Sequence, residues 1–364
     1  MTLRRAQRYN SGVMVNRWQQ AAAALLLTFA FMVLARSGAR ADTTRFEAGS
    51  SPVFFVQLEE GAISVRTWNQ PAVQIDSEQG VQVRHMPAQT VTEHLPAEII
   101  FWSQRVHTPS GDLVLAPEPF ILPNLGNAPH DGVIVRGTGN VYLTVPAGTA
   151  LVVGNVRRGS VSIDGYRNGI FVAHVGAGAV TLSNVSGTGA VQVNNGPVDA
   201  MNSDFSRLRV RTGRGNMRFE SCNATQIEAT SLTGSIMYDN SSFQPGLARF
   251  ETERGDVILG VAGNGVQIGA HSSAGKIFWD GGVTHPGTTD QQATIGRGGP
   301  VVTATSSTGS VIFYSGTFRD HPELQRRFAQ RMHISPDLQR AQQPMILEKK
   351  FPHNGHIHLK RVLR

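Results

Sequence analysis

A short phrase recurs along the chain: one glycine, one small or polar residue, and two apolar residues on either side of a variable one. In the regular series it first appears as Gly159-Ser-Val-Ser-Ile163 and last as Gly309-Ser-Val-Ile-Phe313. The first seven glycines of the series are spaced 19, 18, 19, 19, 21 and 20 residues apart; they are Gly159, Gly178, Gly196, Gly215, Gly234, Gly255 and Gly275. A fixed period of this length predicts a repeat architecture.

A second alternating segment lies between the phrases, as in Leu208-Arg-Val210 and Ile227-Glu-Ala229. Alternation of apolar and polar residues predicts half-buried strands. The intervening turns are too short for crossover helices, so equivalent strands of successive coils are expected to pair in parallel. We therefore predict an all-β chain, folded as a right-handed parallel β-solenoid whose repeats span residues 151–316. The alternative is a β-sandwich, which also uses short strands and regular turns.

These residues carry a family resemblance. The run Val141-Tyr-Leu-Thr-Val-Pro-Ala-Gly148, followed by the phrases GSVSI, GAVTL and GDVIL, resembles the bacterial "putative adhesin" β-strand-repeat family, a domain family of unknown function. Residues 59–79 are similar to its N-terminal pattern. The resemblance covers about residues 50–315 and implies an exported β-helical domain. Within the N-terminal β region, residues 42–150, a proline-rich segment at about 94–129 departs from the pattern and is predicted to be an insertion.

Residues 1–41 read as a secretory signal peptide. Arginines precede an apolar stretch at residues 21–34, and Ala39-Arg-Ala41 forms an A-x-A cleavage site. The stretch is shorter than the ~20 residues that span a bilayer. We therefore expect cleavage and no membrane span afterwards, with an uncleaved anchor as the alternative. The mature protein is expected in the periplasm, at the cell surface or outside the cell.

The signal segment also accounts for the basic charge. The whole chain has a formal charge of +7 and a pI near 10.1, but removal of residues 1–41 leaves 27 basic against 26 acidic residues. No nucleic-acid partner is therefore expected. Cys222 is the only cysteine, so no internal disulfide can form. We expect it to be a small buried hydrophobe, with a reactive thiol as the alternative.

Candidate catalytic chemistry is sparse. The sequence has no HExxH motif, no G-x-S-x-G motif, no phosphate-binding loop and no paired-cysteine metal site, so no cofactor is expected. The most suggestive residues are Arg207, Arg209 and Arg211, which alternate along one strand. Repeat register aligns Arg209 with Glu228 and Arg249, which predicts a structural cross-strand charge ladder. Near the C-terminus His353, His356 and His358 are weak metal candidates, because no carboxylate or cysteine completes a tetrahedral set.

The middle residue of each phrase should face outward. In the early coils it is small, polar or charged, whereas Met237, Ile258, Phe278 and Ile312 form an apolar stripe that requires a cover. The basic tail, residues 317–364, contains a predicted helix at residues 321–332 and a strand. We expect this helix to fold over the stripe; alternatively it caps the open end, or a partner protein covers the stripe. The turn residue Ser235 is expected to be exposed and tolerant of a charge.

These features together favour a non-enzymatic, adhesin-like binding or structural module at the bacterial cell envelope. The expected partner is an envelope component or a polysaccharide. The main alternative is a carbohydrate-active β-helix enzyme, a polysaccharide lyase or glycosidase, which needs catalytic groups converging on one outer face. A further alternative is a docking rail for envelope signalling or assembly.

Overall fold

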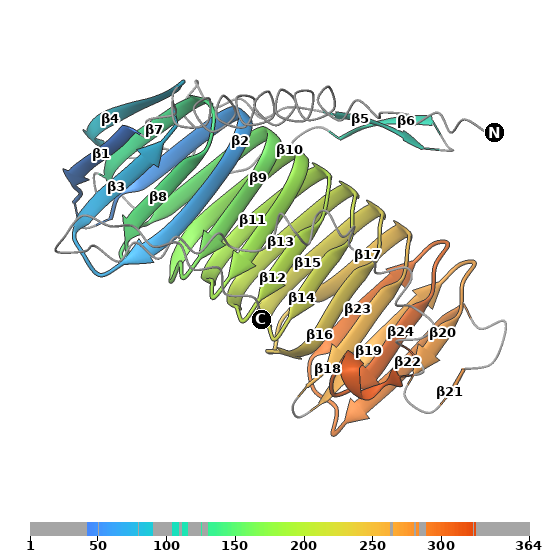
Figure 1. The fold of residues 1–364 in the computed structure, drawn as a ribbon. Helices are drawn as coiled ribbons and strands as arrows, with labels where there is room; N and C mark the ends of the chain where they lie inside the picture. The colour runs from blue at the N-terminus through green and yellow to red at the C-terminus, as the bar shows by residue number, and fades with distance from the viewer. Residues whose placement is uncertain are drawn as a thin grey trace, which may run out of the picture. The chain divides into compact units, whose positions relative to one another are not determined.

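The computed structural model describes residues 42–320 with interruptions at 50, 79, 90–103, 109–110, 116–124, 126–129, 263–264, 280–281 and 284–288, together with His321, Pro322 and Leu324. The described chain is almost entirely β-structure (Figure 1). Its helical residues are the 3₁₀ turn η1 (Phe318–Asp320) and the helical positions Pro322 and Leu324.

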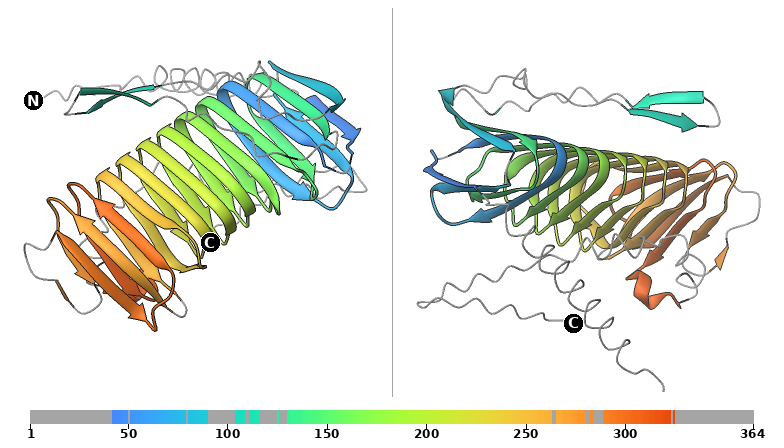
Figure 2. Two further views of the ribbon diagram at one scale, coloured as in Figure 1. Left: turned by 180° about the vertical axis from the view of Figure 1, so that it is seen from behind. Right: turned by 45° about the horizontal axis from the view of Figure 1, so that its top comes forward.

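Most strands belong to two parallel ladders, and each coil of the chain contributes to both (Figures 1 and 2). In spatial order, ladder one contains β7 (His130–Thr138), the first half of β2 (Val53–Trp68), the first halves of β9 (Leu151–Asp164) and β10 (Gly169–Ser183), β11 (Ser186–Asn195), β13 (Asp204–Arg214), β15 (Asn223–Thr233), β17 (Ala248–Arg254), β23 (Val301–Ser306) and β19 (Gly265–Ser272).

Ladder two continues each coil after its corner. In the same order it contains β8 (Val141–Pro146), the second halves of β2, β9 and β10, β12 (Val198–Met201), β14 (Met217–Glu220), β16 (Ile236–Phe243), β18 (Val257–Val261), β24 (Val311–Ser315) and β20 (Ile277–Trp279).

Glycine makes the corner between the ladders. At Gly178 the backbone has φ of 145°, and a Cβ there would lie 1.5 Å from the carbonyl oxygen of Gly159 in the preceding coil. No residue with a side chain fits that approach, and L-residues rarely adopt that φ. The recurring glycine of the sequence is thus a stacking requirement as well as a turn signal.

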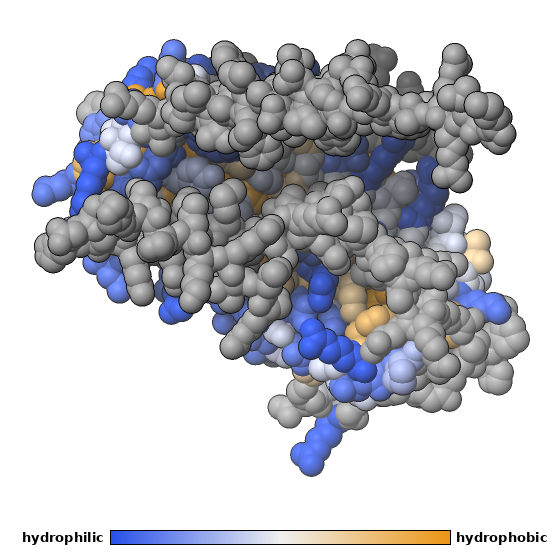
Figure 3. Space-filling model, in the orientation of Figure 1, coloured by the Kyte–Doolittle hydropathy of each residue, from blue (hydrophilic) through white to orange (hydrophobic). Residues whose placement is uncertain are grey.

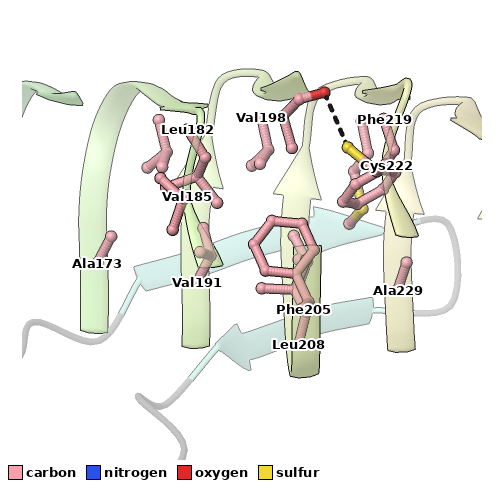
Figure 4. Close-up of a cluster of buried hydrophobic side chains, with 14 of the residues drawn as sticks. Ala173, Leu182, Val185, Val191, Val198, Phe205, Leu208, Phe219, Cys222 and Ala229 are labelled. Carbon is pink, nitrogen blue, oxygen red and sulfur yellow. Dashed lines mark hydrogen bonds between the residues drawn. The ribbon is translucent and has the colours of Figure 1, made fainter. Parts of the chain in front are cut away.

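Inward side chains of both ladders form one continuous core. Figure 4 shows Val191 and Leu208 of ladder one in the same cluster as Leu182 and Phe219 of ladder two. The two apolar residues of the opening phrase are inward as predicted: Ile236 and Tyr238 are both fully buried. The Tyr238 hydroxyl donates to backbone carbonyls of Cys222 and Ser242, so the polar end of this buried ring is satisfied.

The C-terminal end of the stack departs from sequence order. β17 and β18 pair with β23 and β24, and the earlier segments β19 and β20 lie beyond them. Two strands antiparallel to the outer coil follow: β21 (Gly282–Val283) on β20 and β22 (Asp290–Gly296) on β19. The expectation that every coil stacks on its predecessor is therefore wrong here. The phrases at Gly309 and Gly275 make the same corner: a Cβ at Gly309 would lie 1.8 Å from the carbonyl oxygen of Gly255, and one at Gly275 would lie 1.9 Å from that of Gly309.

The N-terminal end shows the same arrangement in reverse. The first coil, β2, lies between β9 and the later coil formed by β7 and β8. Antiparallel strands again cover the outer coil: β3 (Ala72–Ser77) pairs with β8 and β4 (Val81–Gln89) with β7, and β1 (Asp42–Glu47) pairs with β3. At both ends, therefore, the coil nearest the chain terminus is held between two others. The antiparallel strands protect the sheet edges.

The all-β class and the parallel pairing of successive coils from β9 to β18 are confirmed. A β-sandwich of antiparallel sheets does not fit this pairing. The described part of the proline-rich segment contains a separate antiparallel pair, β5 (Gln104–Thr108) and β6 (Gly111–Leu115). The expected signal peptide lies outside the described residues.

Candidate functional site

The outer face of ladder one is polar over β13, β15 and β17. We call the following set the polar face: Arg207, Arg209, Arg211, Glu228, Arg249 and Glu251. These side chains alternate with buried inward residues, so all six project from the same side of the ladder, and each is exposed or half-buried. Figure 3 shows hydrophilic side chains over much of the visible described surface, with a smaller hydrophobic group.

Ion pairs link part of the polar face. Arg209 Nε donates to Glu228 Oε2 across the strands at 2.9 Å, as the predicted charge ladder requires. Glu228 is also in register with Arg249, but Arg249 Nε donates at 2.7 Å to Glu251 on its own strand. The ion pairing thus crosses from β13 to β15 but stays within a single strand at β17. Since all four side chains are partly solvated, each pair contributes only ~0.2–1 kcal/mol.

The outer face of ladder two is apolar from β16 to the C-terminal end of the stack, and it overlaps the polar face at the coils of β15 and β17. This apolar stripe consists of Met237, Ile258, Phe278 and Ile312, whose residual exposures are 6%, 0%, 5% and 0%. The stripe is therefore shielded. Of the helix expected to shield it, only His321, Pro322 and Leu324 are described, and the last two are helical. Docking of this helix stays a prediction.

A buried carboxylate lies beside the apolar stripe. Asp239 Oδ1 accepts hydrogen bonds from the Tyr314 hydroxyl at 3.0 Å and from the Phe318 backbone N–H at 2.9 Å. Gly260 lies between the two strands that carry these groups, and a Cβ there would lie 2.5 Å from the Tyr314 ring. Burial, and then the adjacent carboxylate, raises the pKa of Tyr314 far above its usual range. The tyrosine stays protonated and links β24 to β16 across the intervening strand β18.

The N-terminal half of ladder one has a shielded outer face that the sequence analysis missed. Phe55, Val153 and Val172 point outward there and are buried. Near them His174 Nδ1 donates to Asn155 Oδ1 at 3.0 Å, and both residues are buried. Burial lowers the pKa of His174 to about 4, so the ring is neutral at physiological pH. The unbroken apolar run Leu151-Val-Val153 was the available signal, because a strand buried on both faces does not alternate.

The remaining sequence candidates contribute no described site. Cys222 is fully buried, as expected, and burial raises its thiol pKa to about 12, which makes it a poor nucleophile. His353, His356 and His358 lie outside the described residues. Within the described ranges, no three His, Cys, Asp or Glu side chains lie close enough to hold a metal ion. No helix in the same part of the chain is long and apolar enough to cross a membrane.

Comparison with known proteins gives little further information. No protein-family model matches the chain, and no curated protein matches it. Among solved structures, the chain is similar to a crystal structure described as a "putative cell adhesion protein" from Clostridium sporogenes. The match has 8% sequence identity and a TM-score of 0.22, and it covers 76% of this chain and 99% of the other. At that score the likeness carries no argument about function.

Proposed function

We propose that this protein is an exported, non-enzymatic, adhesin-like binding module of the bacterial cell envelope, built on a right-handed β-solenoid. The parallel ladders and the glycine corners support the solenoid, and the general right-handed chirality of parallel β connections supports its hand. The observation that carries the binding role is the polar face. It is a solvated array of arginine and glutamate side chains on three strands that are hydrogen-bonded side by side.

An array of this kind suits an extended ligand better than a small substrate. Strand neighbours lie ~4.8 Å apart and alternate residues on a strand ~6.8 Å apart, so the side chains form a regular grid. Charged groups on such a grid orient a charged partner and increase its rate of association. An envelope polysaccharide or an envelope protein is the partner class that this surface fits.

Fractionation combined with envelope retention tests the proposal. We expect the processed chain in the periplasmic, surface or extracellular fraction, and we expect immobilised protein to retain material from an envelope extract. Retention of the unprocessed chain in the cytosol, or no retention of envelope material, contradicts the proposal.

The carbohydrate-active enzyme remains the alternative. It requires catalytic groups that converge on one outer face. Incubation with envelope polysaccharides separates the two: new reducing ends or unsaturated products indicate an enzyme, whereas binding without product release indicates a module.

A further inference from the structure

A small hollow opens on the outer face of ladder one, next to the polar face. Its lining includes Gln192, Asn194, Arg211, Gly213, Thr230 and Leu232, from β11, β13 and β15. Strand register places Asn194 between Gly176 of β10 and Gly213 of β13. Gly213 has no side chain, so the Asn194 amide in the neighbouring strand lines the base of the hollow.

The base of the hollow carries an unused hydrogen-bond donor. Asn194 is only 1% exposed, and its Oδ1 accepts from Gln192 Nε2 at 3.2 Å. Its Nδ2 is buried and has no hydrogen-bond partner among the described residues. Buried amide groups are nearly always satisfied in folded proteins, so this N–H₂ group indicates a missing acceptor. The acceptor must enter through the hollow.

The charge around the hollow favours an anionic acceptor. Arg211 lines the wall, and a guanidinium is a permanent cation that carries hydrogen-bond donors and no acceptor. Arg207 and Arg209 stand on the same strand and the same side, so the three arginines form a row ~13 Å long. Planar carboxylates match a guanidinium fork with two parallel hydrogen bonds.

The size of the hollow restricts what enters it. It has room for about one water-sized atom group, such as a single carboxylate oxygen, and not for a sugar ring, so any ring must lie above it on the polar face. We propose that the hollow binds the carboxylate of a uronic acid unit in an acidic polysaccharide, with further carboxylates along the arginine row. This proposal rests on the proposed envelope-binding function and names its ligand class.

Titration calorimetry on the full chain at physiological ionic strength tests it, with oligogalacturonate as the probe. Galacturonate monomer, a neutral galactan oligomer and a single-stranded oligonucleotide serve as comparisons. We expect the oligogalacturonate to bind most tightly, the monomer weakly, and the neutral oligomer not at all. Equal binding of the oligonucleotide would mean that general polyanion attraction is responsible, and the proposal would be wrong.

Two variants probe the hollow itself. Arg211→Gln and Asn194→Leu should each weaken oligogalacturonate binding roughly tenfold or more, the loss expected for a charge-assisted hydrogen bond. Arg158→Gln is the control: it removes the same charge from an exposed arginine in the N-terminal half, outside the polar face and the hollow, and should change the affinity less than about twofold. Unchanged affinity in both hollow variants overturns the proposal.

A measurement on the wild-type protein is also needed, because a variant can lose binding simply by failing to fold. In an NMR titration with oligogalacturonate, the Asn194 side-chain N–H₂ signals should shift. No shift at a saturating concentration means that the amide is satisfied by water only and contradicts the proposal. If Arg211→Gln loses the oligomer but still retains envelope material, the binding-module function and the hollow both stand. If the wild-type chain retains none, the wider function fails.

Discussion

The outer faces of the two ladders differ at the same height of the stack. In the coils of β15 and β17, ladder one presents the solvated polar face, whereas ladder two presents the buried stripe residues Met237 and Ile258. In the N-terminal half the polarity is reversed: Phe55 and Val153 of ladder one are buried outward residues, and Ser162 and Thr181 of ladder two are half-buried polar ones. Most inward residues are apolar along the whole stack, apart from a column of buried hydroxyl side chains beside the corner: Thr212, Ser231, Thr252, Ser306 and Ser272. The inward residues therefore build the common core of the stack, and the outward residues determine which face is exposed to solvent.

The inward positions should give the largest effect on either ladder. Ile236 is fully buried in the core, so Ile236→Asp introduces an unpaired buried charge and should cost at least ~4 kcal/mol of unfolding free energy. Thermal and denaturant melts measure this loss. Ser162→Asp, on the outer face of ladder two, is the control and should cost less than ~1 kcal/mol. Equal losses in the two variants would show that the inward assignment is wrong.

Removal of residues 321–364 tests the shielding of the apolar stripe. If the C-terminal segment is the cover, the truncated protein exposes four large apolar side chains, each worth ~1.5–3 kcal/mol when buried. We expect stronger binding of a hydrophobic dye and concentration-dependent association. Phe278→Ser should reduce dye binding in the truncated protein. A truncated chain that stays monomeric and binds no additional dye contradicts a C-terminal cover.

One residue of the apolar stripe tests whether the outer face of ladder two changes along the stack. Ile258 is fully buried although it points outward, so Ile258→Ser should destabilise the protein by ~2–4 kcal/mol through lost packing. Thr181→Ser, at the same position of an earlier phrase, removes one methyl group from a half-buried site and should cost under ~1 kcal/mol. Chemical denaturation measures both. Similar costs would mean that the outer faces of ladder two do not differ along the stack.

The shielded N-terminal part of ladder one should show a pH dependence. Folding lowers the pKa of His174 to about 4, whereas an unfolded histidine has a pKa near ~6.5. The stabilisation from the neutral buried ring is complete above ~6.5 and is lost as the pH falls toward ~4, by up to ~3 kcal/mol. The register neighbours of His174, Asn155 and Gln192, are uncharged. His174→Gln should remove this slope from unfolding curves measured across that range, and an unchanged slope would assign it to other groups.

The ion pair of the polar face should give the smallest effect. Arg209 and Glu228 are 2.9 Å apart, with 46% and 32% of their side chains exposed. A double-mutant cycle with alanine at both positions should give a coupling of ~0.2–1 kcal/mol that decreases with salt. A coupling above ~2 kcal/mol would mean that this face is structural rather than available for binding.

The sequence predicted the repeat, the inward residues and the Arg209–Glu228 register, because these depend on local alternation and a fixed period. It failed where several segments satisfy the same local rule. The phrases at Gly275 and Gly309 follow the same local pattern, so the pattern could not show that the later phrase stacks on β18 and the earlier one lies beyond it.

Two turn and surface features also depended on contacts between coils. Ser235 was expected to be exposed and tolerant of a charge, but it is buried: its N–H donates to Asn216 Oδ1 and its hydroxyl accepts from the Asp256 N–H. The hollow at Asn194 depends on Gly213 of the neighbouring coil, which lies 19 residues away in the sequence. Both are properties of the stack rather than of one repeat.

Arginine labelling read by mass spectrometry tests the central claim, that the polar face of ladder one is the binding surface. The full chain is treated with an arginine-specific reagent alone and in the presence of the envelope polysaccharide that it retains. The structure predicts that the ligand protects Arg207, Arg209 and Arg211, while Arg158, exposed in the N-terminal half, is labelled equally in both samples. Protection of Arg158 to the same extent, or no protection on β13 in a sample that has bound ligand, would contradict the account.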